Sequence, residues 1–462
     1  MIILENHTEY RMLPKAGNVQ GGVMDYVSEY KSKLVTAEEA VKVVKSGDWV
    51  DYTTATSMPV LLDRALAKRR DELFDVKIRG NLLFGPIEVA ECDESKEHFT
   101  YNSWHCSSYE RKLCDRGLCY YTPMIFHNLT AYYHFFLDVD VAMIAVPPMD
   151  KHGYFNFSVN TGTSAEILRQ ARIVILEINE NLPNVRGGYD DCVHISDVDY
   201  VVEGPHEPFK ASKEHVITEA ERRIAENIIP YVVDGATLQI GIGGMPDAVG
   251  RLLAKSDLKD LGMHTELCSD AYLELFKAGK LTNKYKNINR YKSVLGFAVG
   301  SAELYEWLDN NPSIKAYPLE YVNKPEIIGQ IDNMVSINSC ISVDLYGQVS
   351  SESVGHRHIS GSGGQLDFLE GASISKGGKA FICLNSTFKD KEGKLHSGIV
   401  PSFTGEIITS PRSQVYYIAT EYGVVNLEGA TSWERAERLI SIAHPDFRDE
   451  LIYEARQMKI WR

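Results

Sequence analysis

The chain has 462 residues, of which 44% are hydrophobic and 24% charged, and its formal net charge is −15 at pH 7. This length exceeds what one hydrophobic core usually supports, so we expect two globular domains of roughly 200 residues each. The acidic balance argues against a nucleic-acid partner, which needs clustered lysine and arginine, but it leaves room for a small anionic ligand at a helix N-terminus.

Cysteine use and hydropathy indicate where the protein works. The eight cysteines are scattered, without a Cys-x-x-Cys pair, and no apolar run approaches the roughly 18 residues of a membrane span. Residues 1–25 form a polar leader that lacks the charged-then-apolar pattern of a secretion signal. We therefore expect a reduced, cytoplasmic protein with no membrane partner.

The first elements expected along the chain are a short helix, a strand and a second helix. Thr36 and Glu39 have the spacing of a capping box, and apolar residues follow up to Gly47. Residues 48–53 are predicted as a strand, and Pro59 suits the first position of the next helix. The predicted order is helix, strand, turn, helix.

The second half of the chain repeats this order. Thr218 begins another cap with the same spacing, Gly235 precedes a predicted strand over residues 237–242, and Pro246 opens the next helix. Gly47 lies 12 residues before Pro59, and Gly235 lies 11 residues before Pro246. The repeat predicts two related domains, with their boundary near residues 204–212, where prolines and charges interrupt the periodicity.

Apolar strands are a further sign of the repeat. Residues 141–146 and 337–343 are predicted as buried strands, and each runs into an Asp-x-x-Gly segment, at residues 150–153 and 344–347, that is typical of a hairpin turn. Continuous apolar strands that alternate with helices indicate sheets covered on both faces. The fold class predicted is therefore α/β, with mainly parallel sheets.

A glycine-rich turn in the second half is the first candidate for chemistry. Gly241-x-Gly243-Gly244-x-Pro246 is not a dinucleotide fingerprint, because Pro246 stands where that motif needs glycine. Glycines before a helix let backbone amides approach an anion or a developing oxyanion, although a tight turn without a ligand has the same pattern. Glu266 follows about one helix and one strand later, and a carboxylate near such a loop suggests covalent acyl chemistry.

A second glycine-rich turn covers residues 360–364 and precedes Lys376 and Lys379. If both turns lie at the carboxyl edge of one sheet, they form opposite walls of a pocket, with a lysine on phosphate; solvated surface lysines are the alternative. The pair His356 and His358 has no partner at ligand spacing, so no metal site is predicted.

Several motifs together resemble the acetyl-CoA hydrolase/transferase family of class I CoA-transferases. They are Gly-x-Gly-Gly-Met-Pro-Asp-Ala-Val at 241–249, His-Thr-Glu-Leu-Cys-Ser-Asp at 264–270, Gly-Ser-Gly-Gly-Gln-Leu-Asp-Phe at 361–368, Thr-Glu-Tyr-Gly-Val-Val-Asn-Leu at 420–427 and Ala-His-Pro-Asp-Phe-Arg at 443–448. The resemblance spans residues 26–462 and leaves the leader unmatched. It implies two tandem related CoA-transferase-type α/β domains, at residues 26–207 and 213–462, the second of which carries the catalytic glutamate.

The resemblance also assigns roles to residues. It implies that Glu266 is a nucleophile that forms a glutamyl-CoA thioester, and that the Asn323 amide and the Gly364 backbone N–H form an oxyanion hole. The residues implied in CoA binding are Gly241, Gly243, Gly244, Met245, Pro246, Asp247, Gly363, Gly364 and Lys376.

The implied reaction moves CoA between short-chain carboxylates by a ping-pong route, with an acyl-CoA thioester as substrate and neither a metal nor a permanently bound cofactor. The segments at 102–105, 149–157, 194–200 and 459–462 are most similar to family members that use butyryl-CoA and acetate, and next to those that use 4-hydroxybutyrate. Propionyl, crotonyl and itaconyl groups are further alternatives. An acyl-CoA hydrolase and a non-catalytic acyl-CoA sensor are the other functions considered, and a homodimer or a higher homo-oligomer is expected.

Overall fold

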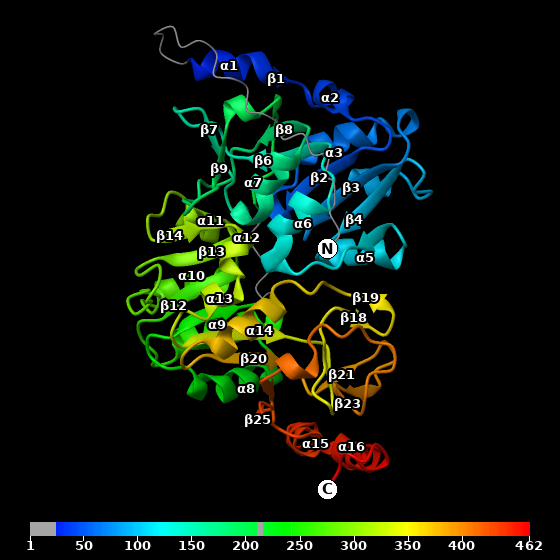
Figure 1. The fold of residues 1–462 in the computed structure, drawn as a ribbon, viewed down its shortest axis with the longest axis vertical. Coiled ribbons are helices and arrows are strands. Elements are labelled where there is room, and N and C mark those ends of the chain that lie inside the picture. The colour runs from blue at the N-terminus through cyan, green and yellow to red at the C-terminus, as the bar shows by residue number, and fades with distance from the viewer. Residues whose placement is uncertain (1–24, 210–215, 242) are drawn as a thin grey trace, which may run out of the picture.

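The computed structural model describes residues 25–209, 216–241 and 243–462. Within these residues the chain forms two eight-stranded sheets, which Figure 1 shows one above the other. The strands of the first sheet are β1 (Leu34–Val35), β2 (Trp49–Thr54), β3 (Val76–Asn81), β4 (Phe99–Ser103), β5 (Cys119–Tyr121), β6 (Val141–Val146), β8 (Ile173–Ile178) and β10 (Tyr200–Glu203). Those of the second are β11 (Thr237–Ile240), β12 (Gly262–Cys268), β13 (Ser293–Ala298), β14 (Ile314–Ala316), β15 (Met334–Ser339), β20 (Lys379–Cys383), β24 (Tyr417–Thr420) and β25 (Gly423–Asn426).

The two sheets share one strand order except at one edge, where β1 precedes the other strands of its sheet in the chain and β25 follows those of its own. The first runs β5-β4-β3-β2-β6-β8-β10-β1, and the second runs β14-β13-β12-β11-β15-β20-β24-β25. In the first sheet the chain starts at the central strand β2, adds β3, β4 and β5 on one side, and then continues on the other side with β6. In the second sheet it starts at β11, adds β12, β13 and β14 on one side, and continues on the other with β15. The fold-class prediction of tandem related α/β units with mainly parallel sheets is confirmed; β25, which pairs antiparallel with β24, is an exception.

The two predicted hairpins have different outcomes. At residues 344–347 the Gly347 N–H donates to the Asp344 carbonyl at 2.8 Å, and β16 (Ser342–Asp344) pairs antiparallel with β17 (Val349–Ser350), as predicted. At residues 150–153 the turn forms, but the hairpin prediction is wrong, because β7 (Tyr154–Asn156) pairs with β9 (Cys192–His194) and not with β6. β6 lies in the middle of its sheet, and both of its edges are already paired with β2 and β8.

Helices lie beside both sheets, and the last two helices of the chain lie at one end of the molecule (Figure 1). They are α1 (Tyr26–Lys33), α2 (Ala37–Ala40), α3 (Val60–Ala67), α4 (Glu88–Glu91), α5 (Ser108–Asp115), α6 (Leu129–Phe135), α7 (Thr161–Gln170), α8 (Glu219–Ile228), α9 (Gly244–Lys255), α10 (Asp270–Lys277), α11 (Ala302–Leu308), α12 (Leu319–Val322), α13 (Pro325–Ile328), α14 (Gln365–Ile374), α15 (Ser432–Ser441) and α16 (Pro445–Gln457). Thr218 forms the predicted capping box with Glu221, and Thr36 caps α2. Pro59 is the residue that caps α3 rather than its first helical residue.

The core of the second half lies on both faces of its sheet. Val335, Ile337 and Phe381 belong to one apolar cluster, whereas their chain neighbours Met334 and Ile382 belong to another. Since successive strand residues point to opposite faces, both faces are buried, which is why these strands are continuous apolar runs.

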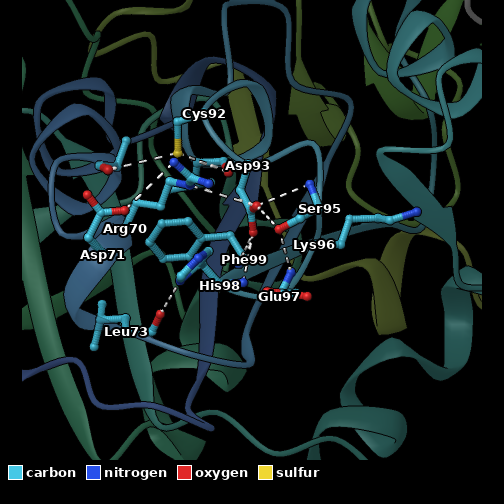
Figure 2. A network of polar contacts seen from close by, with 12 residues as sticks. Arg70, Asp71, Leu73, Cys92, Asp93, Ser95, Lys96, Glu97, His98 and Phe99 are labelled. Atoms are coloured by element: carbon cyan, nitrogen blue, oxygen red, sulfur yellow. Dashed lines mark hydrogen bonds and ion pairs between the residues drawn. The ribbon is translucent and has the colours of Figure 1, made fainter.

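A polar network holds the loop before β4 in the first half (Figure 2). The buried Asp93 carboxylate accepts the backbone N–H groups of Ser95, His98 and Phe99 at 2.8–3.2 Å, and its carboxylate lies 3.8 Å from the Arg70 guanidinium. Burial alone raises the pKa of Asp93, but the hydrogen bond from the Ser95 hydroxyl, at 2.5 Å, and those from the backbone outweigh burial and lower it. The network fixes the entry into β4 and thereby the segment that follows this strand.

A joint core connects the two halves. Leu82, Trp104 and Phe126 of the first half pack with Leu267, Phe297 and others of the second half in one apolar cluster. Leu267 follows Glu266 on β12, so this contact positions the candidate nucleophile against the first half.

Among the described residues, no helix has the length and apolar character needed to cross a membrane. The predicted leader at residues 1–25 lies outside the described residues except for Asp25, which caps α1. The predicted boundary at 204–212 lies partly outside them as well.

Candidate active site

A cavity of about 110 Å³ lies at the carboxyl ends of the central strands, where both halves meet. The first half contributes Asn81, Leu82, His105 and Phe126; the second half contributes Gly241 after β11, Glu266 and Leu267 on β12, Ser339 at the end of β15, and the loop Ser360–Gln365. The chain reverses its strand order between β11 and β15, and ligands of open α/β sheets bind at such a switch point.

Glu266 carries the carboxyl group of this cavity. Its Oε2 accepts a hydrogen bond from Asn323 Nδ2 at 2.7 Å, and the Gly364 backbone N–H also hydrogen-bonds to it. The pKa of Glu266 is raised to about 8, mainly by burial and also by the charge of Asp367, while the two donors act against this rise. A strongly shifted acid in a cavity is a candidate for catalysis.

Asn323 is held by a chain of polar contacts. It follows α12, it is fully buried, and its Nδ2 also lies 3.2 Å from Asp367 Oδ2. His127 Nδ1 lies 2.6 Å from Asp367 Oδ1, and the His127 backbone N–H donates to the other oxygen at 3.2 Å. The hydrogen bond to Asp367 raises the pKa of His127. The first half of the chain therefore orients the amide that contacts Glu266.

Gly364 ends the second glycine-rich turn and caps α14. A Cβ at this position would lie 2.0 Å from Glu266 Oε2 and 2.1 Å from Asn323 Nδ2. Its φ of −93° suits any residue, so contact with Glu266 and Asn323, and not backbone conformation, requires glycine here. Gly363, with φ of +54°, allows the turn itself.

The first glycine-rich turn contributes mainly through Gly241, which lines the cavity. Gly243 has φ of +120°, a conformation open to glycine, and α9 begins at Gly244. Met245 and Pro246 are buried, and Asp247 forms an ion pair with Arg251 at 2.9 Å. The loop therefore presents backbone, not these side chains, toward the cavity.

Lys376 does not line this cavity. It is exposed, and its carbonyl accepts the N–H of Asn333, the residue before β15. α14 runs from the carboxyl edge of the sheet, at Gly364, back to the amino edge, where Lys376 precedes β20. A strand of five or six residues spans roughly 17–20 Å, so Lys376 and Lys379 lie well away from Glu266, and contact of Lys376 with CoA stays a prediction.

The sequence assigns no role to His105 or Asp367, although both lie near Glu266. His105 Nε2 lies 3.2 Å from Ser360 Oγ, and burial lowers the pKa of His105 to about 4, so this wall is neutral at pH 7. Asp367 lies in a motif of the family resemblance, but nothing in the sequence connects it with His127, 240 residues away. Phe126, shortly before α6, also lines the cavity.

Comparisons with known proteins identify the family. The model of the acetyl-CoA hydrolase/transferase N-terminal domain matches residues 20–210, and that of the C-terminal domain matches residues 300–455. The chain is 48% identical over 442 residues to the butyryl-CoA:acetate CoA-transferase of Anaerostipes caccae, covering 95% of this chain and 99% of the relative. It is 42% identical to the 4-hydroxybutyrate coenzyme A transferase of Clostridium kluyveri, covering 94% and 100%.

A solved structure shares the whole fold. The crystal structure of RipA from Yersinia pestis superposes with a TM-score of 0.87 at 37% identity, covering 95% of this chain and all of that one. The chain therefore belongs to the acetyl-CoA hydrolase/transferase family.

Proposed function

We propose that the protein is a CoA-transferase that moves CoA from a short-chain acyl-CoA to acetate, through a glutamyl-CoA thioester on Glu266. Butyryl-CoA is the first donor to test, because the Anaerostipes caccae relative carries that activity in its name. 4-Hydroxybutyryl-CoA is the second, after the Clostridium kluyveri relative.

One observation carries the proposal. The carboxyl of Glu266 lies in the cavity with two donors, Asn323 Nδ2 and the Gly364 N–H, already directed at it. Donors placed at an acyl oxygen before reaction stabilise the oxyanion that develops there without further reorganisation.

The first half-reaction has two steps. The Glu266 carboxylate attacks the thioester carbonyl carbon, the C–S bond breaks, and a mixed anhydride and a CoA thiolate form. The thiolate then attacks the glutamyl carbonyl carbon, and the carboxylate of the first acid leaves. The negative charge of this second tetrahedral intermediate develops on the Glu266 oxygen that Asn323 contacts.

The second half-reaction reverses these steps with acetate. Because one thioester replaces another, the overall free energy is near zero and no external energy source is needed. The cavity of about 110 Å³ is small beside the roughly 300–1,000 Å³ of pockets that enclose drug-sized ligands, so it suits a short acyl group, with the CoA tail outside. Binding of that tail positions the thioester and helps to exclude water from the anhydride.

Chemical trapping tests the covalent step. The enzyme is incubated with butyryl-CoA in the absence of acetate, treated with borohydride, digested and mapped by mass spectrometry. A reduced side chain at residue 266 is the expected result. An active enzyme that shows no reduction there, or reduction at another carboxyl, contradicts the proposed intermediate.

Asn323→Ala should slow the reaction without abolishing it. Removal of one oxyanion donor typically costs about 3 kcal/mol, or some hundredfold in kcat, and the Gly364 N–H remains. Steady-state kinetics with butyryl-CoA and acetate measure the change. A loss confined to KM would contradict the role, because it would show that Asn323 binds substrate and transition state equally.

The rate should rise with pH up to about 8. The carboxylate is the nucleophile, and the pKa of Glu266 of about 8 keeps most of it protonated at neutral pH. Below this pKa, kcat/KM should therefore fall roughly tenfold per pH unit. Asp367→Asn is the matched variant. Loss of the Asp367 charge should lower the pKa of Glu266 and so move the inflection of the pH–rate profile to lower pH. An unchanged inflection would show that another group controls the profile.

The alternative functions predict other results. A hydrolase releases CoA at the same rate with and without acetate, whereas the transferase needs the second acid. The relative with 48% identity is a transferase, and the acetyl-CoA hydrolase of Yarrowia lipolytica is 27% identical, which favours transfer. A non-catalytic sensor would bind acyl-CoA without any turnover that depends on Glu266.

The proposed enzyme has two domains, a CoA-binding surface formed by the glycine-rich turns, and more than one subunit. Residues 26–207 and 213–462 form the two domains, each built on one of the eight-stranded sheets of the described residues. CoA is bound by Gly241, Gly243, Gly244, Met245, Pro246 and Asp247 of the first glycine-rich turn, by Gly363 and Gly364 of the second, and by Lys376. The protein works in the cytoplasm as a homodimer or higher homo-oligomer, which sedimentation of the purified enzyme tests.

A further inference from the structure

Three cysteine side chains gather in the first half, next to the wall of the active-site cavity. Cys106 lies just before α5, Cys114 near the end of this helix, and Cys119 at the start of β5. Their sulfur atoms all lie within 4.8 Å of one another, and the Sγ atoms of Cys106 and Cys114 are 3.7 Å apart. Cys106 and Cys119 are buried, and Cys114 is half-buried.

The fold, and not the spacing, brings these thiols together. α5 ends at a turn through Gly117, whose φ of +72° reverses the chain, and the Leu118 N–H donates back to the Leu113 carbonyl at 2.8 Å. β5 then pairs with β4, which returns Cys119 to the start of the helix. Separations of eight and five residues do not form a Cys-x-x-Cys pair, so a search for such pairs does not detect the cluster.

The arrangement of the sulfurs matches a thiolate cation site. In a tetrahedral zinc site with Zn–S bonds of about 2.3 Å, neighbouring sulfurs are about 3.8 Å apart. The Sγ atoms of Cys106 and Cys114, 3.7 Å apart, are already at this spacing. The Cys119 sulfur lies within 4.8 Å of both, so a shift of about 1 Å or less brings all three sulfurs to the spacing of a zinc site. Soft thiolates select zinc and similar thiophilic cations over calcium or magnesium.

We propose that Cys106, Cys114 and Cys119 bind one thiophilic cation of the zinc class through three sulfurs. The cation enters the site from the side of Cys114, because this thiol is half-buried whereas the other two are buried. Binding displaces the thiol protons to solvent, so the affinity falls as the pH is lowered.

The site is connected to the catalytic cavity. Cys106 follows His105, which lines the cavity, and the Cys106 N–H donates to the Ser360 carbonyl at 3.4 Å. Arg111 lies on α5 together with Cys114, and its Nε donates to the Ile359 carbonyl at 2.7 Å. A bound cation therefore stiffens the segment that holds the loop of Gly363 and Gly364.

The test uses the full-length, reduced, metal-free protein and Cd²⁺ as the probe. In a titration, the sulfur-to-cadmium charge-transfer absorption should saturate at one Cd²⁺ per protein chain. X-ray absorption spectroscopy should show three sulfur atoms bound to the Cd²⁺ ion. The thermal unfolding midpoint should rise with Cd²⁺ concentration, because the cation binds the folded state. Fewer than three sulfur neighbours would overturn the proposal.

Two variants complete the test. Cys114→Ser, at the half-buried position, should weaken Cd²⁺ binding by at least about a hundredfold. Cys192→Ser, which changes a half-buried thiol on β9, should leave binding unchanged. Equal binding by Cys114→Ser and wild type would overturn the proposal. So would a protein whose cluster oxidises to a disulfide in air and shows no cadmium absorption when reduced.

Discussion

Glu266→Gln should abolish CoA transfer, with a loss of at least about 10⁴-fold in kcat. The glutamine side chain has nearly the same shape, and its amide oxygen can still accept the hydrogen bond from Asn323 Nδ2. A neutral amide, however, neither attacks a thioester nor accepts CoA as a thioester. Exchange of labelled acetate into butyryl-CoA measures the loss, and mass spectrometry should show no CoA adduct on the variant.

Stability separates this loss of chemistry from unfolding. The folded-state pKa of Glu266, about 8, lies above the ordinary value of 4.5, so the neutral carboxyl favours folding at low pH and this contribution is lost as the pH rises through 8. Glu266→Gln remains neutral, so it should unfold at the same or a higher temperature than wild type at alkaline pH. Glu303→Gln, at the exposed ion pair with Lys277, is the surface control and should keep full activity. Undiminished exchange by Glu266→Gln would end the proposal of a covalent route.

Gly364→Ala should reduce kcat by about 10³-fold or more. The added methyl group would lie 2.0 Å from Glu266 Oε2 and 2.1 Å from Asn323 Nδ2, so the nucleophile and one oxyanion donor must both move. Loss of a single donor already costs about 10²–10³ in kcat. Single-turnover formation of the enzyme–CoA thioester measures the effect on the chemical steps alone.

A matched glycine provides the control. Gly85→Ala adds the same methyl group at a position with no atom within 4 Å of the new Cβ, so its activity should equal that of wild type. Alanine at 364 adopts a φ of −93° without strain, and α14 should therefore still form. An active Gly364→Ala enzyme would show that Glu266 and Asn323 do not need the close approach that the structure gives them.

The active site depends on contacts between distant parts of the chain. Glu266 comes from β12, Asn323 from the end of α12, and Gly364 from the turn before α14. His127, in the first half, holds Asp367, which in turn contacts Asn323. A variant that loosens the contact between the halves should therefore change catalysis as well as stability.

Much of the fold could be predicted from local patterns. The apolar run at 141–146 forms β6 with the predicted ends, and Thr218 forms its capping box, because burial and capping act over a few residues. The repeat of glycine and proline spacings also corresponds to a real repeat of strand order. The predicted hairpin at 150–153 failed because the partner of β7 is chosen by sheet pairing, which local turn residues do not encode.

By itself the sequence determined that the chain is an α/β protein with two related units, that Glu266 is the residue to examine and that two glycine-rich turns are candidates for its pocket. Motifs and periodicity carry this information because they reflect local backbone needs. The tertiary structure decided which residues meet: it joined His127, Asp367 and Asn323, placed Lys376 at the opposite edge of the sheet and gathered three cysteine sulfurs. It also set the pKa of Glu266 near 8, since burial and neighbouring charge exist once distant segments pack together.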